Sequence, residues 1–207
     1  MGRRNINPEL TSNLNATKEP SQRAKLICDF FLKYGNSSYD ASVTQSQHAL
    51  QTATLAMESD ASRSLTVSSF LHDLGHLLLD EHMGKNAFLD KNLRHENVVI
   101  RVLRAHLSKQ VLEPIRLHVS AKRYLCAIDP SYYLKLSDNT KKSLNLQGGP
   151  MTAEEQRTFE THCYYQDAVK LRHWDDAAKQ PGRKTPDMAY FERLLSLEIL
   201  EHDSRFL

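Results

Sequence analysis

The chain has 207 residues, enough for one domain with a substantial hydrophobic core and too few for two full domains. Its 27 Lys and Arg residues nearly balance its 25 Asp and Glu residues, so the charge predicts neither a nucleic-acid-binding surface nor binding to an anionic membrane. With 40% hydrophobic residues, seven glycines and seven prolines, the composition is that of an ordinary globular protein.

The cysteines predict a reducing compartment, and the hydropathy predicts no membrane span. Cys28, Cys126 and Cys163 are scattered, odd in number and without C-x-x-C spacing, so they predict neither a disulfide framework nor a zinc knuckle. No apolar run approaches the roughly 20 residues that a membrane span needs. The basic start at residues 1–4 has no hydrophobic segment behind it. We therefore expect a cytoplasmic protein without a membrane anchor.

The N-terminal part of the chain divides into a polar segment and a helical one. Residues 1–20 mix Asn, Ser, Thr, Pro and charged residues without periodicity, which predicts a flexible arm, and residues 21–207 are expected to form the folded bundle. The first helix is predicted from about Ser21 to Tyr34, where Gly35 ends it. A second helix is predicted from about Thr44 to Met57.

The middle of the chain continues with helical periodicity. A third helix is predicted from about Ser62 and carries a His-Asp pair near its end, where Gly75 can end or kink it. Another helix is predicted from about Asn92 to Leu107. Pro114 is expected in the first turn of the next helix, where a missing N–H costs little.

The C-terminal part is also helical. A short helix is expected after Asp129, and Thr152 with Glu155 has the spacing of a capping box, which predicts a helix that continues toward Trp174. Met188 to Leu200 forms a last amphipathic segment. Because no pair of strands with a hairpin turn is apparent, the predicted fold class is all-α, a single bundle of about eight helices.

The most informative stretch is the one around His72 and Asp73. An imidazole nitrogen binds one metal ion terminally, whereas a carboxylate has two oxygens and can bridge a pair of ions. His76 follows His72 by one helical turn and shares its helix face. A His-Asp pair alone is a weak signal, so its meaning depends on further ligands elsewhere.

Further candidate ligands lie on otherwise apolar helix faces. They are His48, His95, His118 and Asp175. Singly, each has a plainer interpretation, as a core histidine or a solvated aspartate. Together with the His-Asp pair they give nitrogen and oxygen donors for two metal ions, and the absence of sulfur favours iron or manganese over structural zinc. The remaining histidines are expected on the surface: His82, His106, His162, His173 and His202.

Two cations share helix faces with these candidate ligands. Lys122 comes four residues after His118, and Arg172 comes three residues before Asp175. Together with His76 they would form an anion pocket that suits a phosphate or phosphonate. The alternative for Arg172 is an ion pair with one of the neighbouring aspartates.

Several sequence blocks together resemble a known family. They are Gln47 to Gln51, His72 to His76, Arg94 to Glu96, His118 to Lys122, Ser143 to Met151 and Leu171 to Lys179. The first two occur widely in the HD-domain superfamily, whose signature is His…His-Asp…Asp. The last three in this order are more diagnostic, and with them the chain resembles the HD-domain phosphonate oxygenases, which cleave a carbon–phosphorus bond with O2.

The resemblance implies a dinuclear iron site in the core of an HD-domain bundle and roles for particular residues. The implied ligands of a mixed-valent Fe(II)/Fe(III) pair are His48, His72, Asp73, His95, His118 and Asp175, with Asp73 bridging. The residues implied to contact a small phosphonate substrate are His76, which also has a catalytic role, Lys122, Arg172, Thr140, Ser143 and Tyr39. The implied products are phosphate and a carboxylic acid.

One segment departs from the family pattern. A member of the family carries Tyr-x-x-Glu before the first ligand histidine, where the Glu contacts the substrate amine. Here the segment reads Tyr39, Asp40, Ala41 and Ser42, without a Glu at that spacing. The substrate could therefore be 2-amino-1-hydroxyethylphosphonate, its trimethylammonio analogue, which gives glycine betaine in place of glycine, or a phosphonate without an amine.

Two other functions compete with this interpretation. Most HD-domain proteins are phosphohydrolases, in which the same ligands would activate water against a small phosphoester or a nucleotide. A metal-free helical binding module is the other alternative, although it would leave the ligand-type residues as buried polar groups to be satisfied in other ways. Neither nucleic acid nor a membrane is expected as a partner, and the sequence does not predict the oligomeric state.

Overall fold

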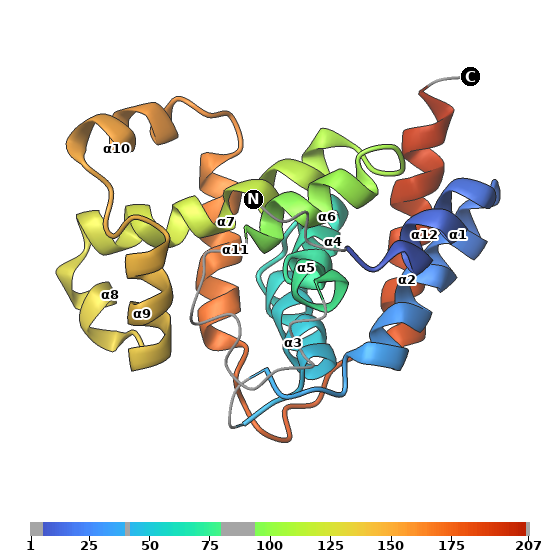
Figure 1. The fold of residues 1–207 in the computed structure, drawn as a ribbon, viewed down its shortest axis with the longest axis horizontal. Coiled ribbons are helices and arrows are strands. Elements are labelled where there is room, and N and C mark those ends of the chain that lie inside the picture. Colours follow the sequence, from blue (N-terminus) through green and yellow to red (C-terminus); the bar gives the residue numbers. More distant parts are fainter. Residues whose placement is uncertain (1–5, 40–41, 80–93, 206–207) are drawn as a thin grey trace.

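Helices account for nearly all regular structure in the protein (Figure 1), for which a computed structural model describes residues 6–39, 42–79 and 94–205. The helices are α1 Pro8–Ala16, α2 Pro20–Tyr34, α3 Gln45–Glu58, α4 Arg63–Leu71, α5 Leu74–Leu78, α6 His95–Leu103, α7 Lys109–Ile128, α8 Pro130–Lys135, α9 Asp138–Leu146, α10 Ala153–Glu160, α11 Tyr165–Ala177 and α12 Met188–Ser204. Within the described ranges the only β-type pairing is an isolated bridge between Ser38 and Thr44. The predicted all-α fold class is confirmed.

Local capping signals explain where several helices begin. Thr44 and Gln47 form a capping box at α3, in which each side chain accepts a hydrogen bond from the other residue's backbone N–H. Thr152 and Glu155 form the predicted capping box at α10. Prolines open α1, α2 and α8, where their missing N–H is not needed.

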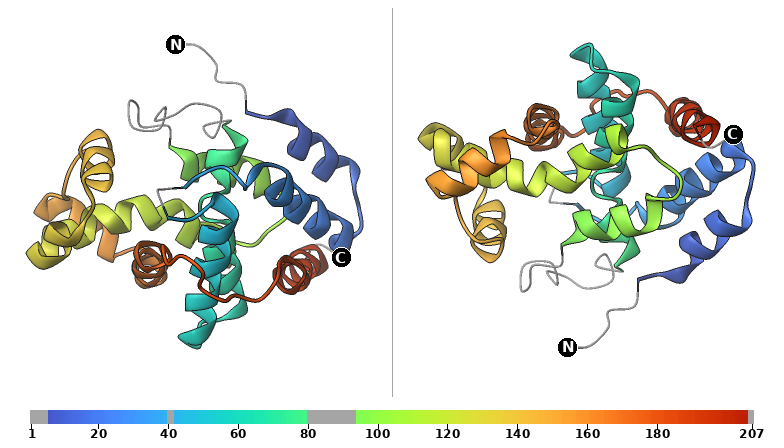
Figure 2. Two further views of the ribbon diagram at one scale, coloured as in Figure 1. Left: turned by 90° about the horizontal axis from the view of Figure 1, so that it is seen from below. Right: turned by 90° about the horizontal axis from the view of Figure 1, so that it is seen from above.

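The main hydrophobic core lies between α2, α4 and α12. The ring of Phe70 lies 4.8 Å from that of Phe31 and 5.5 Å from that of Phe191, measured between centroids. All three side chains are buried. In Figures 1 and 2, α2 and α12 run side by side at one end of the molecule, so the C-terminal helix closes the core that the N-terminal helices begin.

The long helix α7 connects this core with the other end of the molecule. Helices α4 and α6 pack against α7, α11 packs against both α7 and α3, and α8 and α10 contact α7 as well. In Figure 2, α8 to α10 gather at the far end from α1, α2 and α12. The candidate ligands therefore come from helices that meet around the middle of α7.

The first 20 residues differ from the predicted flexible arm. Residues 8–16 form α1, which packs against α2 and buries Leu10 and Leu14. The side chain of Asn7 caps α1, and its backbone N–H donates to Leu78 O at 2.9 Å. Two leucines one turn apart give this polar stretch an apolar stripe that is sufficient to dock it on the bundle.

Two predicted helices end or break at other positions than expected. The helix predicted to carry the His-Asp pair and to end or kink at Gly75 already ends at Leu71, and α5 starts at Leu74, so His72 and Asp73 lie between the two helices and Gly75 lies inside α5. The helix predicted from Thr152 toward Trp174 is divided into α10 and α11 by the turn at residues 161–164. The apolar periodicity continues across both interruptions, which explains why the pattern did not locate the first one correctly and did not predict the second.

Pro114 and His106 also lie at other places than the sequence predicts. Pro114 is in the second turn of α7 and not in its first, because the helix already begins at Lys109. His106 is buried, and its Nδ1 lies 3.2 Å from Nη1 of Arg23, which also pairs with Asp203. The other histidines expected on the surface are exposed His173, half-buried His162 and His202, and His82, which lies outside the described residues.

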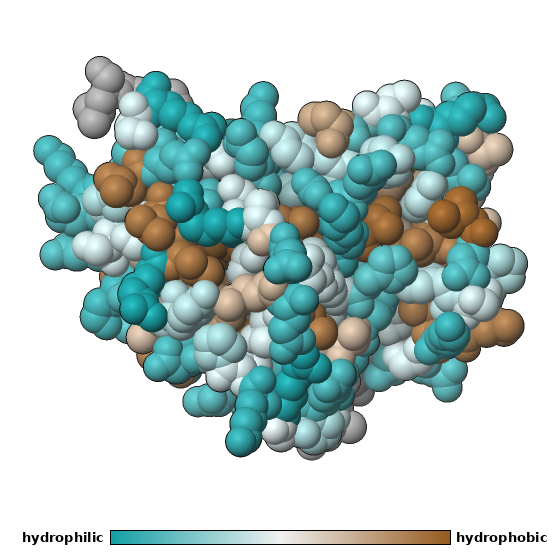
Figure 3. Space-filling model, turned by 180° about the vertical axis from the view of Figure 1, so that it is seen from behind, coloured by the Kyte–Doolittle hydropathy of each residue, from teal (hydrophilic) through white to brown (hydrophobic). Residues whose placement is uncertain are grey.

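The surface seen from behind is mostly hydrophilic, with hydrophobic patches between the polar side chains (Figure 3). Among the helices of the described ranges, none is both long and apolar enough to cross a membrane.

Candidate metal centre and substrate pocket

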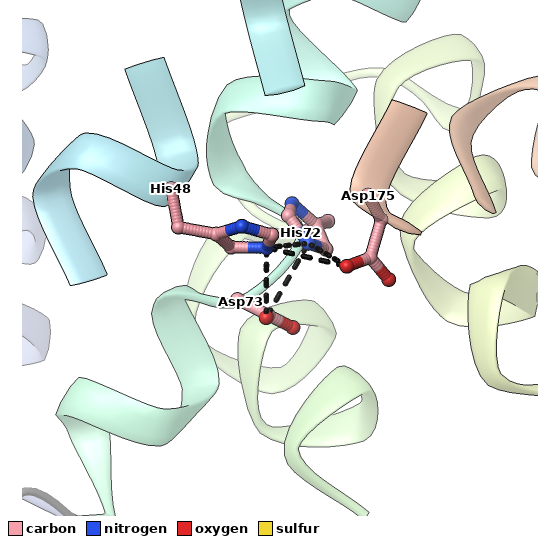
Figure 4. A group of neighbouring side chains, drawn as sticks. All are labelled: His48, His72, Asp73 and Asp175. Carbon is pink, nitrogen blue, oxygen red and sulfur yellow. Dashed lines mark hydrogen bonds and ion pairs between the residues drawn. The ribbon is translucent and has the colours of Figure 1, made fainter. Parts of the chain in front are cut away.

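Four of the six predicted metal ligands converge as shown in Figure 4. His48 comes from α3, His72 and Asp73 come from the junction between α4 and α5, and Asp175 comes from α11. The two histidines are completely buried, and the two aspartates are 7% and 1% exposed. The break between α4 and α5 lets two consecutive residues both face this centre.

These four side chains form the first half of the site. Nε2 of His48 lies 3.2 Å from Nε2 of His72 and 3.2 Å from Oδ1 of Asp175. Oδ2 of Asp73 lies 3.3 Å from Nε2 of His72 and 3.6 Å from Nε2 of His48. Two imidazole nitrogens and two carboxylate oxygens thus surround one point, as ligands of a single ion would.

The second half of the site lies on the other side of Asp73. Nε2 of His95, at the start of α6, is 3.1 Å from Nε2 of His118 on α7. Oδ1 of Asp73 is 3.2 Å from Nε2 of His95, 3.7 Å from Nε2 of His118 and 3.8 Å from Nε2 of His76. Each oxygen of Asp73 therefore faces its own set of histidines, which is the arrangement of a bridging carboxylate.

The hydrogen bonds of the outer ring nitrogens set the protonation of the inner ones. Nδ1 of His48 lies 3.0 Å from Ala178 O, Nδ1 of His72 lies 2.9 Å from Ser69 O, and Nδ1 of His118 lies 2.7 Å from Ile115 O. A backbone carbonyl only accepts, so each Nδ1 carries the hydrogen, and a ring that binds a metal can direct the lone pair of its Nε2 toward the centre. The Nε2 atoms of His48 and His72 lie 3.2 Å apart, and those of His95 and His118 lie 3.1 Å apart. Lone pairs that face each other at these distances repel unless a cation lies between them, so the residues fit a metal.

The pKa shifts of the site residues also indicate that positive charge is stabilised at this centre. Burial alone would lower the pKa of His72, but Asp73 and Asp175 raise that pKa to about 10. Burial would likewise raise the pKa of Asp73, but the imidazoles of His72 and His76 outweigh it and hold that pKa well below its usual range. In His118, burial and the neighbouring His95 lower the pKa well below its usual range. The carboxylates therefore stay ionised and His118 stays neutral, as metal ligation requires.

A pocket with a volume of about 630 Å³ opens onto this centre. Lys122 lines it, is only 4% exposed, and donates a hydrogen bond from Nζ to Ser143 Oγ at 3.3 Å. Burial and the charge of Arg172 lower the pKa of Lys122 to about 7. Thr140 also lines the pocket, and its Oγ1 lies 2.9 Å from Ser137 Oγ. Together these residues form a wall of donors that suits an anion.

Arg172 lies between the pocket and the metal centre. Its Nη1 donates to Asp175 Oδ2 at 2.6 Å, and its Nε donates to Asp176 Oδ2 at 3.0 Å. The ion pairs that are the alternative for Arg172 are thus present with both aspartates, while Arg172 also lines the pocket. The pKa of Asp175 is held well below its usual range, because Arg172 and His48 outweigh the effect of burial.

Two further predicted contact residues flank the ligands. The ring of Tyr39 stacks on that of His48 with the centroids 3.7 Å apart, and its hydroxyl donates to Asp175 Oδ1 at 3.4 Å. His76 stacks on His95 with the centroids 3.9 Å apart and lines the pocket. Asp40, the acidic residue of the segment that departs from the family pattern, lies outside the described residues.

The sequence did not predict every group that shapes the site. Tyr132, on α8, lines the pocket and accepts a hydrogen bond from Nε of Arg172 at 3.1 Å. The backbone carbonyls of Ser69, Ile115 and Ala178 orient three of the candidate ligand histidines, and no side chain in the sequence signals them. For Tyr132 the only available signal was its place on a short helix after Asp129 and Pro130.

The fold and the site define an all-α protein of the HD type with a buried cluster of histidines and aspartates that could hold metal. No protein-family model matches the chain. Hydroxymethylphosphonate dioxygenase of Gimesia maris is 42% identical over 197 residues, which cover 95% of this chain and 98% of the relative. A [1-hydroxy-2-(trimethylamino)ethyl]phosphonate dioxygenase (glycine-betaine-forming) of Leisingera caerulea is 34% identical over 180 residues, 86% of this chain and 91% of the relative. An uncharacterized protein of Acanthamoeba polyphaga mimivirus is 28% identical over 186 residues, 87% of this chain and 84% of the relative.

The chain therefore belongs to the phosphonate dioxygenase family. It is an oxygenase that uses O2 and a metal cofactor, as the sequence predicts.

Proposed function

We propose that the protein is a di-iron oxygenase that cleaves the carbon–phosphorus bond of a 1-hydroxyphosphonate, and that its preferred substrate is hydroxymethylphosphonate. The observation that carries the dinuclear part is the placement of Asp73, whose Oδ2 faces His48 and His72 while its Oδ1 faces His95 and His118. Nitrogen and oxygen donors without sulfur are the ligands that iron takes in such oxygenases.

The iron pair, in the Fe(II)/Fe(III) state, would supply the redox chemistry by which O2 oxidises C1 of the substrate. His48, His72 and Asp175 would hold one ion, His95 and His118 the other, and Asp73 both. For hydroxymethylphosphonic acid the overall reaction is HOCH2PO3H2 + O2 → HCOOH + H3PO4. The carbon–phosphorus bond breaks, C1 is oxidised to the level of formic acid, and O2 is reduced.

The cations of the pocket would bind the phosphonate group. Lys122 is buried beside Ser143, so a phosphonate oxygen there would gain a charge-assisted hydrogen bond at low dielectric. His76 lines the same pocket next to Asp73 and would donate to the phosphonate and hold a proton during turnover. Thr140 and Ser143 offer hydroxyl donors, and Arg172 adds positive charge at the inner wall.

The carboxylates of the pocket support a substrate without an amine. Asp73 and Asp175 are metal ligands in this proposal, Asp176 pairs with Arg172, and Asp129 caps α8 by accepting from the Ser131 N–H. Among the described lining residues, every carboxylate thus already has a role, and none remains to bind an ammonium group. The relative with 42% identity is named for hydroxymethylphosphonate, which has no amine.

The test compares substrates with the iron-loaded protein in air. Hydroxymethylphosphonate, (R)-2-amino-1-hydroxyethylphosphonate and its trimethylammonio analogue are offered separately, and phosphate release is followed. We expect hydroxymethylphosphonate to give the highest kcat/KM, with formate as the second product. Faster release of glycine or glycine betaine from either amine would contradict the substrate assignment. Hydrolysis of 4-nitrophenyl phosphate with no release from any phosphonate would instead indicate a phosphohydrolase.

A further inference from the structure

The carboxylate of Asp175 is divided between two tasks. Its Oδ1 lies 3.2 Å from Nε2 of His48 and 3.8 Å from Nε2 of His72, whereas its Oδ2 accepts a hydrogen bond from Nη1 of Arg172 at 2.6 Å. In Figure 4, one oxygen of Asp175 points toward the two histidines and the other points away. The position of Arg172 therefore determines which way this ligand is turned.

The guanidinium of Arg172 is also held on the edge that faces away from Asp175. Asp176 accepts from both Nε and Nη2 of Arg172, which is the fork-to-fork pairing of a guanidinium with a carboxylate. The hydroxyl of Tyr132 accepts from the same Nε at 3.1 Å and donates to Asp176 Oδ2. This closed triangle leaves Nη1 to face Asp175.

The triangle is well buried and joins separate elements. The side chain of Arg172 is 7% exposed, that of Asp176 is 23% exposed, and Tyr132 is buried. Arg172 and Asp176 lie one turn apart on α11, but Tyr132 comes from α8, which forms part of the pocket wall. At low dielectric, a guanidinium fixed on two sides has little freedom to change its partners.

We infer that Asp176 and Tyr132 are positioning residues that clamp Arg172, so that Arg172 holds Oδ2 of Asp175 and keeps Oδ1 directed at the metal. Neither residue contacts the metal position, and each acts through Arg172. This inference rests on the proposed metal centre, in which Asp175 is a ligand. Because Tyr132 also forms part of the pocket wall, the same contacts connect α8 with the metal ligand on α11.

The test measures how fast the iron-loaded protein loses its metal to an excess of chelator. Loss of an outer partner of a metal ligand typically costs 10- to 100-fold in metal affinity, so we expect Asp176→Asn to release iron about 10- to 100-fold faster than the wild type. Tyr132→Phe removes one hydroxyl and should act in the same direction to a smaller extent. The matched controls are Asp167→Asn on the same helix and Tyr133→Phe on α8, which should release iron at the wild-type rate.

A double-mutant cycle separates positioning from general destabilisation. In an Arg172→Gln background, Asp176→Asn should add little to the rate of iron release, because the residue through which Asp176 acts is gone. An equal effect with and without Arg172 would overturn the inference, and so would wild-type release rates in both Asp176→Asn and Tyr132→Phe. If Asp176→Asn does not fold, Tyr132→Phe still decides, since it loses only an oxygen atom.

The wild-type protein in the same series keeps this inference distinct from the proposed function. If it retains iron and releases phosphate from a 1-hydroxyphosphonate in air, while the variants release iron as it does, the inference alone fails. If it retains iron but acts on no 1-hydroxyphosphonate, the proposed function fails, and the release rates still decide the role of Asp176 and Tyr132.

Discussion

Gly75 occupies a position where a side chain has no room. A Cβ atom there would lie 2.1 Å from the backbone oxygen of His95, so α5 and the start of α6 approach each other closely at this point. A glycine in this stretch suggested a helix end or kink, but the structure gives it a packing role inside α5. The residue thus helps to set the position of His95, a proposed metal ligand that lies 20 positions further along the chain.

We predict that Gly75→Ala displaces His95 and weakens metal retention by about 10-fold or more while leaving helicity nearly unchanged. Iron content after loading and circular dichroism together check this. Gly182→Ala is the matched control, because Gly182 has a φ of +72° and a Cβ atom added there would have no neighbour within 4 Å. It should lose some stability and retain its iron. Full iron occupancy in Gly75→Ala would contradict the role of this contact.

The lowered pKa of Lys122 predicts that anion binding depends on pH. Burial and Arg172 lower its pKa from about 10.5 to about 7, so in the free enzyme the side chain is charged below that pH and becomes neutral above it. Affinity for inorganic phosphate should therefore fall as the pH rises through this pKa. Lys122→Arg should flatten that fall, because a guanidinium stays protonated throughout.

The measurement is the dissociation constant for phosphate at several pH values on either side of this pKa. Ionisation of phosphate itself affects both proteins equally, so the ratio between them isolates Lys122. Lys142→Arg, on the exposed side of α9, is the control and should follow the wild type. Parallel curves for the wild type and Lys122→Arg would show that Lys122 does not bind the anion.

Individual residues differ in how well the sequence predicts them. The histidines and aspartates proposed as ligands are of residue types that rarely lie on apolar faces without a reason, and they do converge in the structure. His106 also follows this pattern but is buried against Arg23, far along the chain, by contacts that no spacing reveals. The orienting carbonyl of Ala178 is equally invisible, because every residue carries a carbonyl.

At the scale of an element, α1 provides the clearest test. Its Leu14 is completely buried, so α1 should contribute to stability even though its composition suggested a flexible arm. Leu14→Ala should lower the free energy of unfolding by about 2–5 kcal/mol, the usual cost of a large buried aliphatic side chain. Asn15→Ala, at an exposed neighbouring position, should have little effect. Identical denaturant midpoints for Leu14→Ala and the wild type would support the flexible arm.

The elements were predictable where local chemistry defines them. The capping box of Thr152 and Glu155 fixes the start of α10 through backbone N–H groups of the same turn, so it is visible in the sequence. The break between Leu71 and Leu74 is different. There, tertiary contacts turn both His72 and Asp73 toward other helices, and the apolar pattern continues through the break. Long-range packing decides where such an interruption falls, so the sequence predicted an end or kink at Gly75 but did not locate the break at His72 and Asp73.

At the scale of the whole molecule, the formal net charge of +2 does not reveal that several charged side chains are buried together. Lys122 and Arg172 lie in one buried pocket beside Asp73 and Asp175, while most other charged side chains lie at the surface. The all-α class follows from periodicity, but the meeting of α3, α6, α7 and α11 at one point depends on packing between distant segments. Ligand-type residues on apolar faces suggested one shared site, and the resemblance to HD-domain oxygenases then assigned the residues on these helices to it.

The most direct test of a metal-dependent oxygenase is phosphate release by the iron-loaded protein, with hydroxymethylphosphonate, under air and under argon, while O2 uptake is recorded. We expect release only under air, with one O2 consumed for each phosphate formed, and no release from Asp73→Asn protein. Equal release with and without oxygen would contradict an oxygenase, because the same ligands would then be activating water.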